Sequence, residues 1–225
     1  MTPISLITDY DVARALAAGV LVFSFILLSQ RRLFSLLANY GGQALVLAAA
    51  TAWQAYVQQA PQLYITAAIT LVFKAIVIPV VLRRIVVHFK IHRTIETVLG
   101  GGVTLMIGIA LVALAILLMF PITAGAGILA RESLAVALAV VLLGFLIMIT
   151  RRNAISQVVG FMSIENGLIL AAVGVKGMPL VVELLIAFSV LVAFVIFGVF
   201  FFHIRERFDT LDIYQLENFR GERQP

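Results

Sequence analysis

Residues 150–174 read TRRNAISQVVGFMSIENGLILAAVG, an arginine pair followed by an apolar run that contains a single carboxylate, Glu165. The run is long enough for a membrane-spanning helix, because about 20 apolar residues cross a hydrocarbon core of ~30 Å. At 1.5 Å per residue, Glu165 lies roughly 20 Å along that helix from Arg152, near the middle of the bilayer. Placing a charge at that depth costs at least ~2.5–3.5 kcal/mol on insertion scales. Glu165 is therefore the first candidate functional residue.

The rest of the 225-residue chain has the same apolar character, with 63% hydrophobic and 12% charged residues. Soluble domains have roughly 45–50% apolar and 25% charged residues, so the composition is that of an integral membrane protein. The apolar runs are continuous and do not alternate with polar residues, which favours helices over a β-barrel. The formal charge of +5 comes from basic residues in short connections between these runs. We therefore predict an all-α protein whose environment is the lipid bilayer, and no nucleic-acid partner.

Seven apolar runs of about the length of a membrane-spanning helix divide the chain. We predict a single transmembrane bundle over residues 1–225 and a cytoplasmic tail over 204–225. The first run is predicted to be a retained span and not a signal peptide, because Asp9 and Asp11 precede it without any basic residue. The predicted spans are approximately 12–30, 34–58, 62–82, 97–120, 131–150, 153–175 and 179–203.

Basic residues alternate between the two ends of this predicted bundle. The odd-numbered connections and the tail hold twelve of them, and the other side holds only Arg14, Arg131 and Lys176. The positive-inside rule then places the N-terminus outside and the C-terminus in the cytoplasm. The twelve are Arg31, Arg32, Arg83, Arg84, Lys90, Arg93, Arg151, Arg152, Arg205, Arg207, Arg220 and Arg223.

Small residues recur along the helix that carries Glu165, at spacings of three and four that suit close helix packing. At 100° per residue, Glu165 lies about 160° from Gly167, on the opposite face. One face is thus predicted to pack against a neighbouring helix while the other presents the acid. The acid is either a proton-handling group or a neutral hydrogen-bonding contact between helices, and the sequence leaves both open. The small residues are Gly160, Ser163, Gly167, Ala171 and Gly174.

Three further titratable residues are candidates for a proton relay. Lys74 lies inside the third run, five residues before Pro79, whose missing N–H permits a kink. Its ammonium group is either part of a relay, or it reaches the headgroups or neutralises an acid of another subunit. Glu183 lies near the outer end of the last run, where a carboxylate is also favoured by the helix dipole. His203 at the inner end is either an entry-side proton group or an interface residue.

By depth alone, Lys74, Glu165 and Glu183 form a ladder from the inside to the outside. No metal site is predicted, because His88 and His92 have no third ligand in a recognisable spacing. The chain has no cysteine, so it cannot hold an iron–sulfur cluster through thiolates. Any redox chemistry is expected in partner subunits.

The segment RRNAISQVVGFMSIENGLILAAVG at 151–174 and the tail segment TLDIYQLENFRGE at 210–222 resemble hydrogenase-4 component E, a membrane subunit of group 4 nickel–iron hydrogenase complexes such as formate hydrogenlyase. The segment FKAIVIPVVL around Lys74 is similar to the third span of that family. The part 153–225 is also similar to chain K of respiratory complex I and to component C of Mrp-type cation antiporters. Chain K keeps its central acid at the position held here by Met162, and a second acid has no counterpart within 187–194.

This resemblance implies a non-catalytic membrane-arm subunit that lies beside antiporter-like subunits in the cell inner membrane. Peripheral hydrogenase subunits would carry the nickel–iron and iron–sulfur centres, and this chain would hold no cofactor. Glu165 and Lys74 would belong to a hydrophilic axis that couples redox chemistry to proton or sodium movement. The alternatives are membership of a multisubunit Mrp-type antiporter and a purely structural spacer.

Overall fold

The computed structural model describes residues 3–88, 95, 97–125 and 128–174, without the side chains of residues 3–9, 128 and 129. All of these residues belong to one compact unit, Met1–Ile186; the second unit, Ala187–Pro225, lies outside the described residues. The predicted span 179–203 and the tail 204–225 therefore also lie outside them. So do two of the candidate relay residues, Glu183 and His203.

The described segments are helical and contain no strand. Six helices are long and apolar enough to cross a membrane, which confirms the helical, multi-pass character predicted from composition. One of the six, Pro61–His88, is built from three consecutive segments, α3, η1 and α4. The helices are α1 Pro3–Ser29, α2 Leu33–Gln58, α3 Pro61–Ile69, η1 Thr70–Val77, α4 Ile78–His88, α5 Gly101–Ile122, α6 Ile128–Thr150 and α7 Ala154–Gly174.

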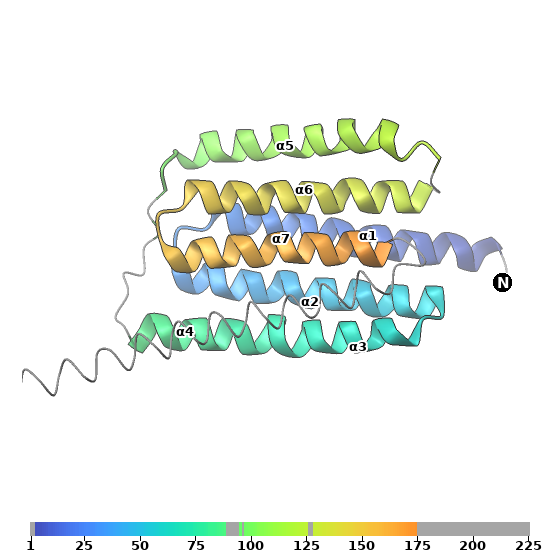
Figure 1. Ribbon diagram of the computed structural model, residues 1–225, viewed down its shortest axis with the longest axis horizontal. Helices are drawn as coiled ribbons and strands as arrows, with labels where there is room; N and C mark the ends of the chain where they lie inside the picture. Colours follow the sequence, from blue (N-terminus) through green and yellow to red (C-terminus); the bar gives the residue numbers. More distant parts are fainter. Residues whose placement is uncertain (1–2, 89–94, 96, 126–127, 175–225) are drawn as a thin grey trace, which may run out of the picture. The chain divides into compact units, whose positions relative to one another are not determined.

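Four helices, α1, α2, α6 and α7, pack together at the centre of this unit. Helix α5 lies against α6 and α1 on one side, and the segments α3, η1 and α4 lie against α2 on the other (Figure 1). Consecutive spans run in opposite directions, with α3, η1 and α4 counted as one span. The ends of α1, α4 and α6 therefore lie at the same end of the unit as the starts of α2, α5 and α7 (Figure 1). We call this the arginine end, because Arg31 and Arg151 lie there.

At the arginine end, the helix bounds differ from the approximate span boundaries at two places. The third span continues past Leu82 to His88, so Arg83 and Arg84 lie on helix α4 and not in a connection. The fourth helix begins at Gly101 and not at Thr97, because main-chain hydrogen bonds hold the preceding residues in a different conformation. The N–H of Ile95 donates to the Arg31 carbonyl at 2.8 Å, and the N–H of Val98 donates to the Thr150 carbonyl at 2.9 Å.

Glycines bring α6 and α7 into close contact, as the small-residue pattern predicted. A Cβ atom at Gly160 would lie 3.1 Å from the Gly144 carbonyl oxygen, and one at Gly167 would lie 3.0 Å from the Ala137 carbonyl oxygen. Larger residues would therefore push the two backbones apart. Ser163 does not belong to this contact, since its hydroxyl faces α2. The α6 contact turns the opposite face of α7, which carries Glu165, toward the interior of the bundle.

The third span widens into a π-helix, η1, immediately before Pro79. The hydrogen bonds shift by one residue there, and the N–H of Ile78 reaches the carbonyl of Phe73, five residues back. Pro79 has no N–H to continue the α-helical ladder, so it leaves the Ala75 carbonyl without its usual partner. Helix α2 passes close to that carbonyl at Gly41, where a Cβ atom would lie 3.1 Å from the Ala75 oxygen. Lys74 lies within this widened segment.

Candidate functional site

Lys74 and Glu165 form a buried ion pair between η1 and α7. The Lys74 Nζ lies 3.2 Å from Oε2 of Glu165, and the two side chains are only 3% and 2% exposed. The same ammonium group donates a hydrogen bond to Oδ1 of Asn166 at 3.0 Å. The structure therefore brings together two of the four sequence candidates. Their part in proton transfer stays a prediction.

Asn166 connects the ion pair to a chain of polar side chains that crosses the bundle. Its Nδ2 donates to Oε1 of Gln43 at 3.1 Å. The Nε2 of Gln43 in turn donates to Oγ of Ser24 at 2.7 Å and to Oγ of Ser163 at 3.1 Å. Each of these side chains is fully buried. With Tyr40, they form what we call the polar cluster: Ser24, Tyr40, Gln43, Lys74, Ser163, Glu165 and Asn166.

The lysine sets the direction of this chain of hydrogen bonds. An ammonium group can only donate, so Asn166 must turn its carbonyl oxygen toward Lys74. The amide nitrogen of Asn166 then faces Gln43, whose own oxygen must accept and whose nitrogen must donate onward to the serines. The orientation of two buried amides thus depends on the charge state and position of one lysine.

Two polar groups in the cluster are incompletely satisfied. The Oε1 of Glu165 is buried and has no hydrogen-bond partner among the described residues, and the same holds for the Tyr40 hydroxyl. Tyr40 lies close enough to Glu165 and Asn166 to interact electrostatically with both. A buried polar group without a partner is costly, and natural proteins usually keep such groups where they have a role. The cluster therefore has unused hydrogen-bonding capacity at Glu165 and Tyr40.

An apolar layer separates the polar cluster from the end of the bundle opposite the arginine end. Gln43, Leu47 and Thr51 lie on successive turns of α2, about 6 Å apart along the axis. Leu47 packs in one apolar group with Val20 of α1 and Ile169 of α7, all of them nearly or fully inaccessible to solvent. On α1, α2 and α7 the polar cluster is thus followed by one apolar turn on that side, whereas the third span carries the buried Thr70 there.

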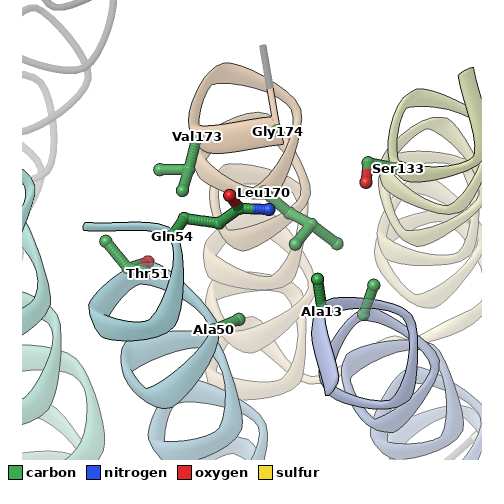
Figure 2. Close-up of a pocket in the computed structure, with 9 residues that line it drawn as sticks. Ala13, Ala50, Thr51, Gln54, Ser133, Leu170, Val173 and Gly174 are labelled. Atoms are coloured by element: carbon green, nitrogen blue, oxygen red, sulfur yellow. The ribbon is translucent and has the colours of Figure 1, made fainter. Parts of the chain in front are cut away.

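Beyond this layer lies a small cavity with a partly polar wall. Figure 2 shows Gln54 of α2 extending toward Leu170 of α7, with Ser133 of α6 facing the same space. Gln54 and Ser133 are each nearly buried. The polar groups of the cavity could hold water, but they do not contact the polar cluster. The lining residues are Ala13, Ala17, Ala50, Thr51, Gln54, Ser133, Leu170, Val173 and Gly174.

The geometry changes one of the sequence interpretations. Lys74 and Glu165 are not successive steps of a ladder between the two ends, because they contact each other near the middle of their helices. The π-helical segment and the long lysine side chain place both charges at one level. Glu183, the third member of that ladder, lies outside the described residues. Asn39 and Gln43 lie one turn apart on α2, but only Gln43 bonds across helices, since Asn39 donates to the Ser35 carbonyl of its own helix.

Sequence reasoning missed three members of the cluster, Tyr40, Ser24 and Asn166. Asn166 directly follows Glu165 and was the easiest to find, since a second polar residue at bilayer depth needs a partner as much as the first. Ser24 gave no such signal, because a serine hydroxyl in a membrane helix ordinarily bonds to its own backbone, and this one also donates to the Val20 carbonyl. Across the described segments, no three His, Asp or Glu side chains lie close enough together to bind a metal ion.

Comparison with known proteins gives one partial similarity. The chain is 38% identical over 85 residues to the Uncharacterized protein Rv0085 of Mycobacterium tuberculosis (strain ATCC 25618 / H37Rv). The matched stretch covers 37% of this chain and 39% of that protein. The match thus spans well under half of the relative's length. No family model matches the chain, and no solved structure matches it.

Proposed function

We propose that this chain is a non-catalytic membrane-arm subunit of an energy-converting complex of the group 4 nickel–iron hydrogenase type. In this proposal the Lys74–Glu165 pair takes part in moving protons or sodium ions, and the partner subunits carry out the redox chemistry. The observation that carries the proposal is the ion pair itself, buried between two helices that are long and apolar enough to cross a membrane. The resemblance of the segments around both residues to hydrogenase-4 component E supplies the family.

The energetics of the pair favour a functional role over a purely structural one. Well-packed apolar residues in place of a buried ion pair are often neutral or stabilising by ~1–4 kcal/mol, so stability alone gives little reason to keep the charges. A structural pair would also be expected to satisfy its remaining lone pairs, whereas Oε1 of Glu165 has no partner among the described residues. The π-helix at Lys74 supports the same reading, because such segments occur frequently at functional sites.

The resemblance to a membrane-arm subunit favours membership of a complex over a stand-alone transporter. The apolar layer of Val20, Leu47 and Ile169 lies on the α1, α2 and α7 side of the polar cluster, toward the end opposite the arginine end. On the third span, the buried Thr70 and Thr66 lie about one and two turns from Lys74 toward that same end. The arginines at the arginine end support a cytoplasmic orientation of that end in the inner membrane; they are Arg31, Arg32, Arg83, Arg84, Arg151 and Arg152.

The first experiment identifies the assembly. The tagged chain is purified in mild detergent and its partners are identified by mass spectrometry. A nickel–iron subunit and antiporter-like membrane subunits are expected. Antiporter subunits without any nickel–iron subunit would instead favour the Mrp-type alternative. A chain that purifies alone and moves ions in liposomes would refute a role within a larger complex.

The second experiment tests the ion pair in the assembled complex. Glu165→Gln is compared with Glu132→Gln, a carboxylate at the exposed rim that pairs with Arg14. The coupling is measured on the assembled fraction of each variant, because loss of the buried carboxylate also lowers stability. Only Glu165→Gln is expected to lower the number of ions moved per electron pair. Normal coupling in a correctly assembled Glu165→Gln complex would favour the structural spacer.

A further inference from the structure

Arg151, at the connection between α6 and α7, is a buried arginine with unused hydrogen-bond donors. Its side chain is only 2% exposed, and its Nη2 donates to the Leu28 carbonyl at 2.5 Å, at the end of α1. Its Nε and Nη1 are buried and have no hydrogen-bond partner among the described residues. Capping the end of α1 therefore accounts for only one of the three guanidinium nitrogens. The other two require an acceptor.

A second arginine lies beside the first without a counter-ion among the described residues. The Ile95 N–H donates to the Arg31 carbonyl, and Thr97, two residues later, pairs with Arg151, so the two arginines lie beside the same short segment. Burial, and then repulsion from Arg31, lower the pKa of the Arg151 guanidinium group, in agreement with this placement. Arg31 itself is exposed, and none of the ion pairs formed by described residues involves it. Two adjacent guanidinium groups, one of them buried, favour an anion between or beside them.

The start of α5 adds further donors at the same place. Nη2 of Arg31 would lie 3.0 Å from a Cβ atom at Gly101, the first residue of this 22-residue helix. The N-cap residue, Gly100, has no side chain to bond the free N–H groups of the first turn. A Cβ atom at Gly100 or Gly102 would meet nothing within 4 Å, so a ligand can approach the backbone directly. Free N–H groups and the helix dipole attract phosphate.

We propose that Arg31, Arg151 and the first turn of α5 form a binding site for the phosphate group of an anionic phospholipid. The lipid is the source that the position favours, because the site lies where the candidate spans Tyr10–Ser29 and Ala130–Thr150 end and Gly101–Ile122 begins. That is the level at which headgroup phosphates are concentrated. The inference needs the helices to lie in a bilayer, and it does not depend on membership of a hydrogenase complex.

The test compares lipid binding by the full chain and four variants. Each protein is stripped of lipid in an uncharged detergent, and phosphatidylglycerol or phosphatidylcholine is added. Native mass spectrometry then counts retained lipids, and thermal unfolding measures the stabilisation. The variants are Arg31→Gln, Arg151→Gln and Gly101→Pro, with Arg84→Gln as an exposed arginine control on α4. Proline is tolerated at the first helical position and removes one N–H, and Gly100 already has the extended conformation that must precede it.

We expect one phosphatidylglycerol to be retained by the wild-type chain in preference to phosphatidylcholine. Arg31→Gln should weaken its binding about fivefold, the ratio expected for one basic residue at a membrane surface. Gly101→Pro should weaken it to a smaller extent, and Arg84→Gln should leave it unchanged. If Arg151→Gln fails to fold because α1 loses its cap, Arg31→Gln and Gly101→Pro still decide the question.

Three results would overturn the proposal. Equal losses in Arg31→Gln and Arg84→Gln would show a diffuse attraction to a basic surface. The same stabilisation by millimolar inorganic phosphate, without lipid, would reject the lipid as the source. A loss of stability in Arg31→Gln and Arg151→Gln that is the same in both lipids would indicate a counter-ion within the protein.

Discussion

Replacing Lys74 with methionine keeps the length of the side chain and removes its charge, which leaves Glu165 without its cation. Replacing Glu165 with glutamine does the opposite, and the double variant removes both charges. These three variants and the wild type form a double-mutant cycle, which measures the coupling between the two residues. The exposed pair of Arg14 and Glu132, whose side chains are 46% and 42% exposed, provides a second cycle as a control.

The burial of the two pairs sets the expected magnitudes. Removing one member of a buried pair typically costs ~3–5 kcal/mol, because the other charge is left alone in an apolar environment. Removing both members leaves no such charge, so the double variant is expected to lie within about 1.5 kcal/mol of the wild type. The coupling between Lys74 and Glu165 should therefore exceed ~4 kcal/mol. The exposed pair should give only ~0.2–1 kcal/mol.

Reversible unfolding from mixed micelles provides the assay, followed through the fluorescence of Trp53, the single tryptophan of the chain. The magnitude matters, because ordinary hydrogen bonds between membrane helices average only ~0.6 kcal/mol. If the single losses add in the double variant to within ~0.5 kcal/mol, the residues do not interact energetically. Such additivity would refute the ion pair as the organising contact of the site.

Three further predictions follow from the packing and the hydrogen bonds, and the same unfolding assay checks each. Gly167→Ala should lower the free energy of unfolding by ~1–3 kcal/mol, because the new Cβ atom meets the backbone of α6. In the control Gly102→Ala the new Cβ atom meets nothing, so that variant should be neutral or slightly stabilising. Equal effects of the two substitutions would contradict the close α6–α7 contact. Asn166→Ala should cost ~1–3 kcal/mol of stability, because the hydrogen bonds to Lys74 and Gln43 are lost. Asn39 bonds only within its own helix, so Asn39→Ala should cost less than ~0.5 kcal/mol. A reversed order would refute the assigned network. Tyr40→Phe should change stability by less than ~0.5 kcal/mol, and a loss above ~1 kcal/mol would reveal a partner for the hydroxyl.

The sequence was sufficient to predict that Glu165 faces the interior, because that prediction depends only on helical geometry and the small residues beside it. The cost of a charge in hydrocarbon likewise identified Lys74 as a residue in need of a partner. Neither argument could show that the two are partners. That result depends on which helices are neighbours and on the π-helical segment before Pro79, which fixes the rotation of Lys74 about the helix axis.

The missed boundaries and residues have a common physical cause. The third span was predicted to end at Leu82 because arginines follow it, yet a helix continues past Arg83 and Arg84 as long as their long side chains can reach polar surroundings. Arg151 was counted as one more loop charge, although its side chain is buried against the end of α1. Charge patterns predict which side of a membrane a residue lies on, but not whether its side chain turns inward to cap a helix.

The polar cluster differs from an isolated ion pair because its hydrogen bonds have a single direction. Lys74 can only donate, and this requirement passes through Asn166 to Gln43 and then to Ser24 and Ser163. If Glu165 takes a proton, the ammonium group loses its counter-charge, and Lys74 must find another acceptor or give up a proton. Asn166 would then lose the donor that orients it, and both amides would be free to reverse. A change of charge between η1 and α7 would thereby reach α1 and α2. In the proposed function, this is the physical route by which the chain couples one part of the complex to another.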